Sequence, residues 1–368
     1  MRILFFASDY KIGLSSLLTD ELIALGKIDC TILSVAGESQ QEDHLERSLK
    51  GHHIDLIRIH GLDEHKHFMS LRKNISNIVK EHNIDILHVQ NNWQLALAAA
   101  CKIHLLHKKR LKTIYTVHGF RNNHPIKSII ARIVIGLCLF LLADKIIFPS
   151  QYLKRIFNFL SYKGYVLPLG INDHYFFHNL LPSPKDKLRL IFPAQFRKGK
   201  NQDMIIRAFA DFLNRRTKKD AMLCLPGLGE LREECISLAK KLEIEKNVVF
   251  PGLLSKEKIK DLYIDSNVAI VASNSETFGQ SIVEPFVLGR CVVSRYVGVA
   301  QEIIKEDVNG FIYKDQKELT DILLKLENNI ELLKQIEENN FGQRSKFSWA
   351  NIAYDYFDNI VKPLEQCN

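Results

Sequence analysis

Short apolar runs alternate with helical patterns along the first half of the chain. The run Ile3–Ala7 is fully apolar and is followed by polar residues, which is typical of a buried strand. The same pattern predicts further strands at 30–35, 84–89, 112–117 and 145–149, and helices at 16–25 and 73–82. Strands that alternate with helices predict parallel pairing through right-handed crossovers, and therefore a doubly wound α/β sheet.

A second series of the same kind follows the polar, proline-containing stretch 180–187, which has no apolar period and marks a domain boundary. This series predicts strands at 188–193, 221–225, 248–250, 268–272 and 291–294, and helices at 201–214, 230–242 and 259–265. A further helix is expected to open at Glu284, with Pro285 at its tolerated first position. We therefore expect two doubly wound domains, 1–180 and 181–345, with ligands in the cleft at the carboxyl ends of their strands.

Composition fits this picture. The 368 residues are 46% hydrophobic and 25% charged, as in an ordinary globular protein, and are enough for two cores. The seven cysteines are scattered without a C-x-x-C pair, which argues against a zinc site or a disulfide framework and favours a reducing cytoplasm. The apolar run at the N-terminus is too short for a signal peptide.

The net charge of +8 is concentrated in one block. Residues 101–163 hold 12 basic residues and a single acid, Asp144, which suggests an anionic partner such as lipid head groups, a phosphorylated substrate or nucleic acid. The same block contains the apolar segment 129–143, which is shorter than the roughly 20 residues that span a bilayer. Two interpretations stay open: a buried helix, or a helix that lies on the membrane surface with the help of the neighbouring cations.

Two glutamates stand out in the stretch 273–284. Glu276 lies in a polar loop after the strand predicted at 268–272, and Glu284 follows eight positions later. A loop before a helix presents free backbone N–H groups, and Gly279 lets the backbone approach a ligand closely. Carboxylates accept hydrogen bonds from sugar hydroxyls, although such a pair is more often a helix cap and a solvated charge.

The surrounding sequence resembles the large retaining glycosyltransferase family of GT-B fold that carries the Glu-x7-Glu motif (glycosyltransferase family 4, group 1 type). The resemblance is specific across about 190–315 and looser across 1–178, and it is carried by residues 225–232, 247–253, 265–293, 297–302 and 309–312. It implies two Rossmann-like domains that face a central cleft. By analogy with this fold, the tail 346–368 is expected to cross back to the N-terminal domain.

The resemblance assigns roles to the residues around the motif. It implies that Glu276 contacts the transferred sugar, and that the backbone amides of Phe278, Gly279 and Gln280 bind the sugar hydroxyls. It implies that Glu284 holds the ribose hydroxyls of the nucleotide.

The resemblance also implies a basic pair that neutralises the diphosphate of the donor. Lys200 matches the family lysine, but Gln195 stands where the family has an arginine. Arg197 or Lys198 is the candidate replacement for that charge, and the alternative for these cations is an ordinary basic surface loop.

The resemblance also assigns roles to two residues of the N-terminal half. His118 directly follows a predicted strand, at the place of a family histidine that faces the transferred sugar; the alternative is a structural histidine. Gly13 matches the glycine-bearing first loop near the diphosphate, on the strength of one glycine only. His88 and Gln90 either line the acceptor cleft or pack in the core.

The departing nucleoside diphosphate sets a requirement for positive charge in the site. A nucleoside diphosphate departs with extra negative charge, and no Asp-x-Asp metal motif stands at a predicted strand end. Cationic side chains and helix N-termini must then stabilise the leaving group, so we expect no catalytic metal. The expected donor is a nucleotide-diphosphate sugar, a UDP-sugar, with no further cofactor.

The resemblance implies transfer with retention of anomeric configuration, by a front-face displacement in which the leaving phosphate helps to deprotonate the acceptor. The basic block favours a membrane-linked acceptor, for which we expect a polyprenyl-diphosphate-linked glycan of O-antigen, lipopolysaccharide or capsule synthesis. The protein would then be cytoplasmic and peripheral on the inner face of the cell membrane.

Other functions compete with this hypothesis. One is a nucleotide-sugar epimerase or hydrolase of the same fold, which would turn over donor without acceptor. Another is a non-enzymatic module that binds lipid or nucleic acid, although no helix-turn-helix, zinc finger or aromatic-basic sheet signature is present, so we expect no nucleic acid partner. A dinucleotide oxidoreductase is disfavoured because no G-x-G-x-x-G follows the first strand.

Overall fold

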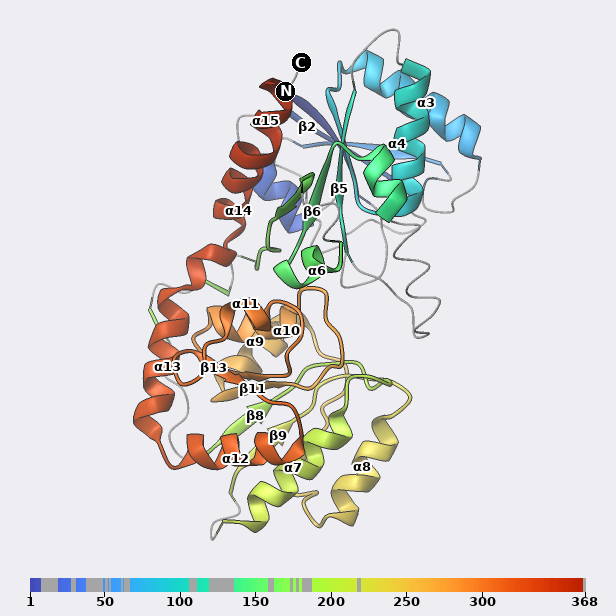
Figure 1. The fold of residues 1–368 in the computed structure, drawn as a ribbon. Coiled ribbons are helices and arrows are strands. Elements are labelled where there is room, and N and C mark those ends of the chain that lie inside the picture. Colours follow the sequence, from blue (N-terminus) through green and yellow to red (C-terminus); the bar gives the residue numbers. More distant parts are fainter. Residues whose placement is uncertain are drawn as a thin grey trace. The chain divides into compact units, whose positions relative to one another are not determined.

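The computed structural model of the protein describes residues 1–7, 19–27, 31–37, 49, 52, 54–60, 62, 67–105, 111–118, 136–157, 162–172, 175–176, 179–180, 187–216 and 220–366. The chain divides into two compact units (Figure 1). The first comprises Met1–Asn172 and Trp349–Asn368, and the second comprises Asp173–Ser348.

The chain passes from one unit to the other between 172 and 173, whereas the sequence pattern placed the boundary at 180. Asn172 belongs with the first unit because its Nδ2 donates a hydrogen bond of 2.7 Å to Oδ1 of Asp20. Tyr175 belongs with the second unit, where burial and then the charge of Glu284 raise the pKa of its hydroxyl. Local contacts of this kind set the boundary, and the apolar pattern does not reveal them.

A parallel sheet forms the centre of the first unit, with its strands in the order β3-β2-β1-β4-β5-β6-β7. The strands are β1 (Arg2–Phe6), β2 (Thr31–Gly37), β3 (Asp55–Ile59), β4 (Ile86–Val89), β5 (Lys112–Thr116), β6 (Lys145–Phe148) and β7 (Gly164–Val166). Ile3 of β1 lies opposite both Ile32 of β2 and Ile86 of β4, so the strand order reverses between β1 and β4. The apolar pattern missed β3, whose side chains are mostly half-buried, and the three-residue β7.

Helices cover both faces of this sheet. They are α3 (Phe68–Glu81), α4 (Asn92–Leu105), α6 (Gln151–Ile156), α14 (Trp349–Tyr356), the π-helical turn η4 (Phe357–Val361) and α15 (Lys362–Gln366), and residues 19–25 are also helical. One apolar cluster joins α3 and α4 to the sheet, and a second joins residues 22–25 and the C-terminal helices to the other face (Figure 1). The tail expected from 346 thus groups with the first unit from Trp349 onward.

A further short helix, at 136–142, is the described part of the apolar segment 129–143. Leu139 and Ala143 on its inner side are buried, whereas Leu137, Phe140 and Leu141 are exposed. Residues 136–142 therefore bury one side against the core and expose the other, and residues 129–135 of the segment lie outside the described residues. No helix among the described residues is long and apolar enough to cross a membrane.

The second unit is built around another parallel sheet, in the order β10-β9-β8-β11-β12-β13. The strands are β8 (Arg189–Ile191), β9 (Met222–Cys224), β10 (Val248–Val249), β11 (Val268–Val271), β12 (Cys291–Ser294) and β13 (Gly310–Ile312). β11 consists of four consecutive apolar residues, all of them fully buried, as expected of a parallel strand covered on both faces. The order reverses between β8 and β11, which are paired through Leu190 and Val268.

The helices of the second unit also form two layers. They are α7 (Gln202–Asn214), α8 (Arg232–Lys241), α9 (Lys256–Ile264), α10 (Gln280–Val287), α11 (Ala300–Ile303), α12 (Gln316–Glu327), α13 (Ile330–Gly342) and the 3-10 turn η3 (Arg344–Phe347). α7 packs against α8 and α12 on one face, and α10 packs against α9 and α13 on the other (Figure 1). The two sheets confirm the predicted class, an α/β chain of two doubly wound domains.

Candidate active site

The loops after β8 and β11 lie side by side, because the strand order of the second sheet reverses between these two strands. The backbone N–H of Asn274 donates to the carbonyl of Gly199 at 2.8 Å. Asn201 Nδ2 donates to the carbonyl of Ala272 and to Oδ1 of Asn274, both at 2.7 Å. Arg295 Nη1 donates to the same Asn274 oxygen at 2.6 Å. The bonds from Asn274 and Asn201 fix the loops after β8 and β11 to each other, and Arg295 ties the loop after β12 to them.

Lys200 and Glu276 meet at this junction. Lys200 Nζ lies 2.5 Å from Glu276 Oε1, and the two side chains are only 16% and 17% exposed. Partial burial strengthens such a pair relative to one in bulk water. The arrangement places one cation and one hydrogen-bond acceptor at the carboxyl end of the sheet, where doubly wound folds bind ligands.

A close backbone approach shapes the loop after β8. Gly227, with φ of +143°, lies so near Ala194 that a Cβ would fall 2.1 Å from the Ala194 carbonyl oxygen. The N–H of Ala194 in turn donates to the carbonyl of Pro226 at 3.0 Å. Gln195 and Arg197, which follow in the same loop, have exposed side chains.

The loop after β11 leads into α10, whose N-cap is Gly279 with φ of 98°. Glycine has no side chain to cap the helix, so no side-chain cap hydrogen bond covers the N-terminus of α10, an arrangement that suits oxygen-rich ligands. The buried Phe278 is held by Gly298, where a Cβ would lie 2.3 Å from the Phe278 carbonyl oxygen, and by the N–H of Val299, which donates to that oxygen at 2.8 Å.

The helix that carries Glu284 starts earlier than expected. α10 begins at Gln280, so Glu284 lies in its second turn and Pro285 lies inside the helix. The prediction that the helix opens at Glu284 was wrong, because it relied on the preference of proline for a first position. Burial of Ile282 and Phe286 stabilises the short helix despite the proline.

Glu284 occupies a niche lined by tyrosines. Burial raises the pKa of its carboxyl to about 7, while Lys256 and the nearby Tyr263 hydroxyl act in the opposite direction. Tyr263 is fully buried, and the charge of Glu284 also raises the pKa of the Tyr175 hydroxyl. Glu284 is therefore poised to lose its proton when a ligand supplies hydrogen-bond donors.

In the first unit, His118 follows β5 and Gln90 follows the neighbouring β4. Oε1 of Gln90 accepts a hydrogen bond from Nε2 of His118, so that nitrogen carries the proton and Nδ1 keeps its lone pair. Burial lowers the pKa of His118 to about 4, which makes its ring neutral at pH 7.

His88 lies in the core rather than at a surface. Its Nε2 pairs with Thr116 Oγ1 at 2.8 Å and its Nδ1 with the Tyr356 hydroxyl at 3.1 Å. Burial, and then the nearby His118, lower its pKa to about 3. Of the two open interpretations of this residue, the packing one is the one observed. Gly13 lies outside the described residues.

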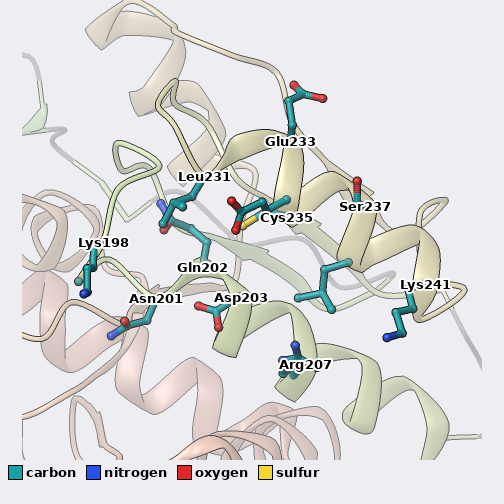
Figure 2. A pocket seen from close by; sticks show the side chains of 13 residues that line it. Lys198, Asn201, Gln202, Asp203, Arg207, Leu231, Glu233, Cys235, Ser237 and Lys241 are labelled. Atoms are coloured by element: carbon teal, nitrogen blue, oxygen red, sulfur yellow. The ribbon is translucent and has the colours of Figure 1, made fainter.

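A cavity of about 700 Å³ lies between α7 and α8, next to the loop after β8 (Figure 2). Lys198 and Asn201 stand at one end, and Ser237 and Lys241 lie toward the other. Neither Glu276 nor Glu284 lines it. Among the described residues, no group of three His, Cys, Asp or Glu side chains gathers that could hold a metal ion.

Comparison with known proteins covers most of the chain. Residues 17–175 match the family "Glycosyltransferase Family 4", and residues 175–343 match "Glycosyl transferases group 1". The chain aligns over its full length with HepE from Anabaena in complex with UDP, covering 100% of that chain, with a TM-score of 0.77 and 18% identity.

The protein is a GT-B glycosyltransferase.

Its curated relatives carry different names. The glycosyltransferase is 24% identical to the N-acetyl-alpha-D-glucosaminyl L-malate synthase of Bacillus anthracis, over 81% of this chain and 77% of that protein. It is 24% identical to the O-antigen biosynthesis glycosyltransferase WclY of Escherichia coli, over 67% of this chain and 71% of the relative. It also matches 41% of the length of an uncharacterized glycosyltransferase of Methanocaldococcus jannaschii at 28% identity.

The structure of the glycosyltransferase brings together some of the predicted residues and adds others. Lys200 and Glu276 are in contact, and Glu284 lies in the helix that follows. The sequence did not reveal Tyr263 or Lys256 as neighbours of Glu284, because both come from α9 and only the packing of α9 against α10 brings them close.

Proposed function

We propose that this glycosyltransferase retains anomeric configuration and moves a hexose or N-acetylhexosamine from a UDP-sugar to a polyprenyl-diphosphate-linked glycan of bacterial surface polysaccharide synthesis. The observation that carries the proposal is the contact between Lys200 and Glu276, which puts a cation and an acceptor together before the N-terminus of α10. The UDP bound to the structurally similar HepE supports the choice of nucleotide.

The donor diphosphate binds Lys200 in this proposal. A departing diphosphate gains negative charge, and a preorganised ammonium group stabilises that charge as it develops. Arg197 or Lys198, which lie exposed in the same loop, supply the second cation where Gln195 replaces the family arginine. From the family resemblance alone, Gly13 is proposed to approach the diphosphate.

Glu276 accepts hydrogen bonds from the hydroxyls of the transferred sugar. The backbone N–H groups of Phe278, Gly279 and Gln280 complete this end of the site, since a helix N-terminus favours oxygen-rich ligands. The neutral ring of His118 offers its Nδ1 lone pair to a sugar hydroxyl.

Glu284 binds the two ribose hydroxyls in its ionised form. Burial raises the pKa of Glu284 to about 7, so part of the free protein is protonated at this residue near neutral pH. Because the donor binds the ionised carboxylate, its binding releases that proton. This residue therefore acts in binding and not as an acid or base.

Retention is supported by the family resemblance and by the relative whose name records an alpha-linked product. In a front-face displacement the acceptor oxygen bonds to the anomeric carbon on the side that the diphosphate leaves. The leaving phosphate oxygen takes the proton of the acceptor hydroxyl. Lys200 and the α10 N-terminus stabilise this reaction electrostatically, and we expect it to proceed without a metal ion.

A membrane-linked acceptor is supported by the basic block at 101–163 and by the O-antigen relative. The proposed place of action is the inner face of the cell membrane, which exposes anionic lipid head groups to cationic proteins.

The test incubates the full chain with labelled UDP-sugars and a polyprenyl-diphosphate-linked acceptor in EDTA. The expected result is labelled lipid-linked product that requires acceptor. Folded protein that binds UDP but transfers none of the common sugars would refute the proposal. Donor turnover at the same rate without acceptor would instead indicate an epimerase or hydrolase.

A further inference from the structure

Asn201 does not use its side chain to cap the helix that it precedes. It is the N-cap of α7, a position at which an asparagine side chain commonly accepts a hydrogen bond from the first turn of its own helix. Asn201 accepts no such bond, and its φ of 54° lies in the left-handed region. Its Nδ2 instead donates to the carbonyl of Ala272 and to Oδ1 of Asn274, both at 2.7 Å. The side chain therefore joins the loop after β8 to the loop after β11.

This arrangement at Asn201 works against local stability. A side-chain cap stabilises a helix, and a left-handed backbone costs free energy at any residue other than glycine, although asparagine tolerates it better than most. Backbone strain of this kind clusters at functional sites, where the surrounding structure holds it in place. The site next to Asn201 is the contact between Lys200 and Glu276.

Asn274 is the centre of the connection between the loops. Its Oδ1 accepts hydrogen bonds from Nδ2 of Asn201 at 2.7 Å and from Nη1 of Arg295 at 2.6 Å. These two bonds occupy both lone pairs of the oxygen. Removing either donor therefore leaves Asn274 less firmly held.

Arg295 reaches Asn274 from a third loop. It follows β12, which pairs with β11, and its backbone N–H donates to the carbonyl of Val271 at 3.0 Å. Burial raises the pKa of the nearby Tyr313 hydroxyl, and the charge of the half-buried Arg295 acts in the opposite direction. Among the described residues no carboxylate forms an ion pair with Arg295, so its guanidinium serves Asn274 rather than an acid. We call Asn201, Asn274 and Arg295 the loop clamp.

The loop clamp acts on the backbone beside Lys200. The N–H of Asn274 donates to the carbonyl of Gly199, the residue before Lys200, at 2.8 Å. Asn274 itself stands two positions before Glu276, so one residue fixes the backbone near both ends of the Lys200–Glu276 contact. A displacement of about 1 Å in a group that takes part in a reaction can slow that reaction about 10²-fold.

We propose that Asn201, Asn274 and Arg295 are positioning residues, which hold Lys200 where it meets the diphosphate of the donor. They act through the loops after β8 and β11 and not by touching the donor. This inference rests on the proposed function in taking Lys200 to bind the diphosphate, and it adds three residues to which that function gives no role.

The test compares variants of the full chain at Arg295. Arg295→Met removes the hydrogen-bond donor and keeps a long side chain, whereas Arg295→Lys keeps a donor for Asn274. Arg215→Met is the matched control, because Arg215 also donates to a side chain, Oδ1 of Asp321 at 3.0 Å, but follows the opposite end of α7. Transfer is measured in EDTA, and the binding of UDP and of uridine is measured on the same proteins.

Arg295→Met is expected to lower kcat about 10–10²-fold and to weaken UDP binding about tenfold. Uridine, which lacks the diphosphate, should bind as it does to the wild type. Arg295→Lys should restore most of both losses, and Arg215→Met should match the wild type. In a Lys200→Gln background, Arg295→Met should have little further effect, because the group that it positions is already absent.

Asn201→Gly tests the loop clamp at a position where folding is not at risk. Glycine adopts the left-handed backbone of residue 201 without strain, so the variant should keep the melting temperature of the wild type while losing turnover and UDP affinity.

Three results would overturn the inference. One is Arg295→Met and Asn201→Gly binding UDP as tightly as the wild type. Another is an equal weakening of UDP and uridine binding, which indicates a general structural defect. The third is a full further loss from Arg295→Met in the Lys200→Gln background. A wild-type chain that binds UDP but transfers no sugar would overturn the proposed function instead, and the comparison of UDP with uridine would still decide on the loop clamp.

Discussion

Glu284 is the residue at which stability and binding are expected to conflict. Burial raises the pKa of its carboxyl from 4.5 to about 7, so the folded protein disfavours the ionised form. A carboxyl whose pKa is raised on folding contributes most to stability when protonated, below pH 4.5. That contribution is lost as the pH rises through 7.

The substitution Glu284→Gln keeps the size of the side chain and removes this dependence. At 1.36 kcal/mol for each pKa unit, the cost of ionising Glu284 in the folded chain is about 3 kcal/mol at pH 8 and about 1 kcal/mol at pH 5. These values are upper bounds, since the side chain is half-buried and partly screened by solvent. For a unit of this size each kcal/mol shifts the melting temperature by about 2–4 °C.

Thermal melts of both proteins at pH 5 and pH 8 test the reasoning. We expect Glu284→Gln to melt above the wild type at pH 8, by at most about 6–12 °C, with a much smaller gain at pH 5. The same variant should bind UDP at least about tenfold more weakly, through loss of charge-assisted bonds. The exposed Glu245→Gln serves as the control. The burial argument is refuted if the gain in melting temperature of Glu284→Gln over the wild type is no larger at pH 8 than at pH 5.

Three further predictions concern the loops around the sheets. Lys200→Gln should lower kcat about 10²–10³-fold by removing one preorganised charge, whereas the exposed Lys317→Gln, outside the proposed site, changes kcat much less; equal losses would count against a special role for Lys200. Gln90→Glu places a negative charge beside the ring of His118 and should raise the pKa of that ring by about one to three pH units. NMR titration of the ring measures this pKa, and an unchanged value would contradict the hydrogen bond between the two residues. Gly298→Ala should destabilise the second unit by about 2 kcal/mol or more in a denaturant titration, because φ is +51° and a carbonyl oxygen lies 2.3 Å from the new Cβ; unchanged stability would refute the close approach.

Some elements of the fold follow directly from the apolar pattern. β11 and β12 are runs of buried residues with no exposed position, so their strands were predictable. α4 was missed because it buries residues on most of its circumference and has little amphipathic period. β3 was missed because it is mostly half-buried.

The candidate site was predictable to the extent that its residues follow neighbouring strands. Lys200 and Glu276 come after β8 and β11, which parallel pairing places next to each other, so their contact follows from the topology. The hydrogen bond between Gln90 and His118 arises in the same way after β4 and β5. Tyr263 was not predictable, because its place beside Glu284 depends on how α9 packs against α10.

The central claim, that the Lys200–Glu276 junction serves transfer with retention, is tested most directly by proton NMR of the reaction in EDTA. The account predicts that the α-linked sugar of a UDP-sugar appears in the product as a new α-anomeric proton, in step with UDP release. It also predicts that Glu276→Gln slows this signal while leaving UDP binding largely unchanged. A β-anomeric product, or α-product formed at the wild-type rate by Glu276→Gln, would contradict it.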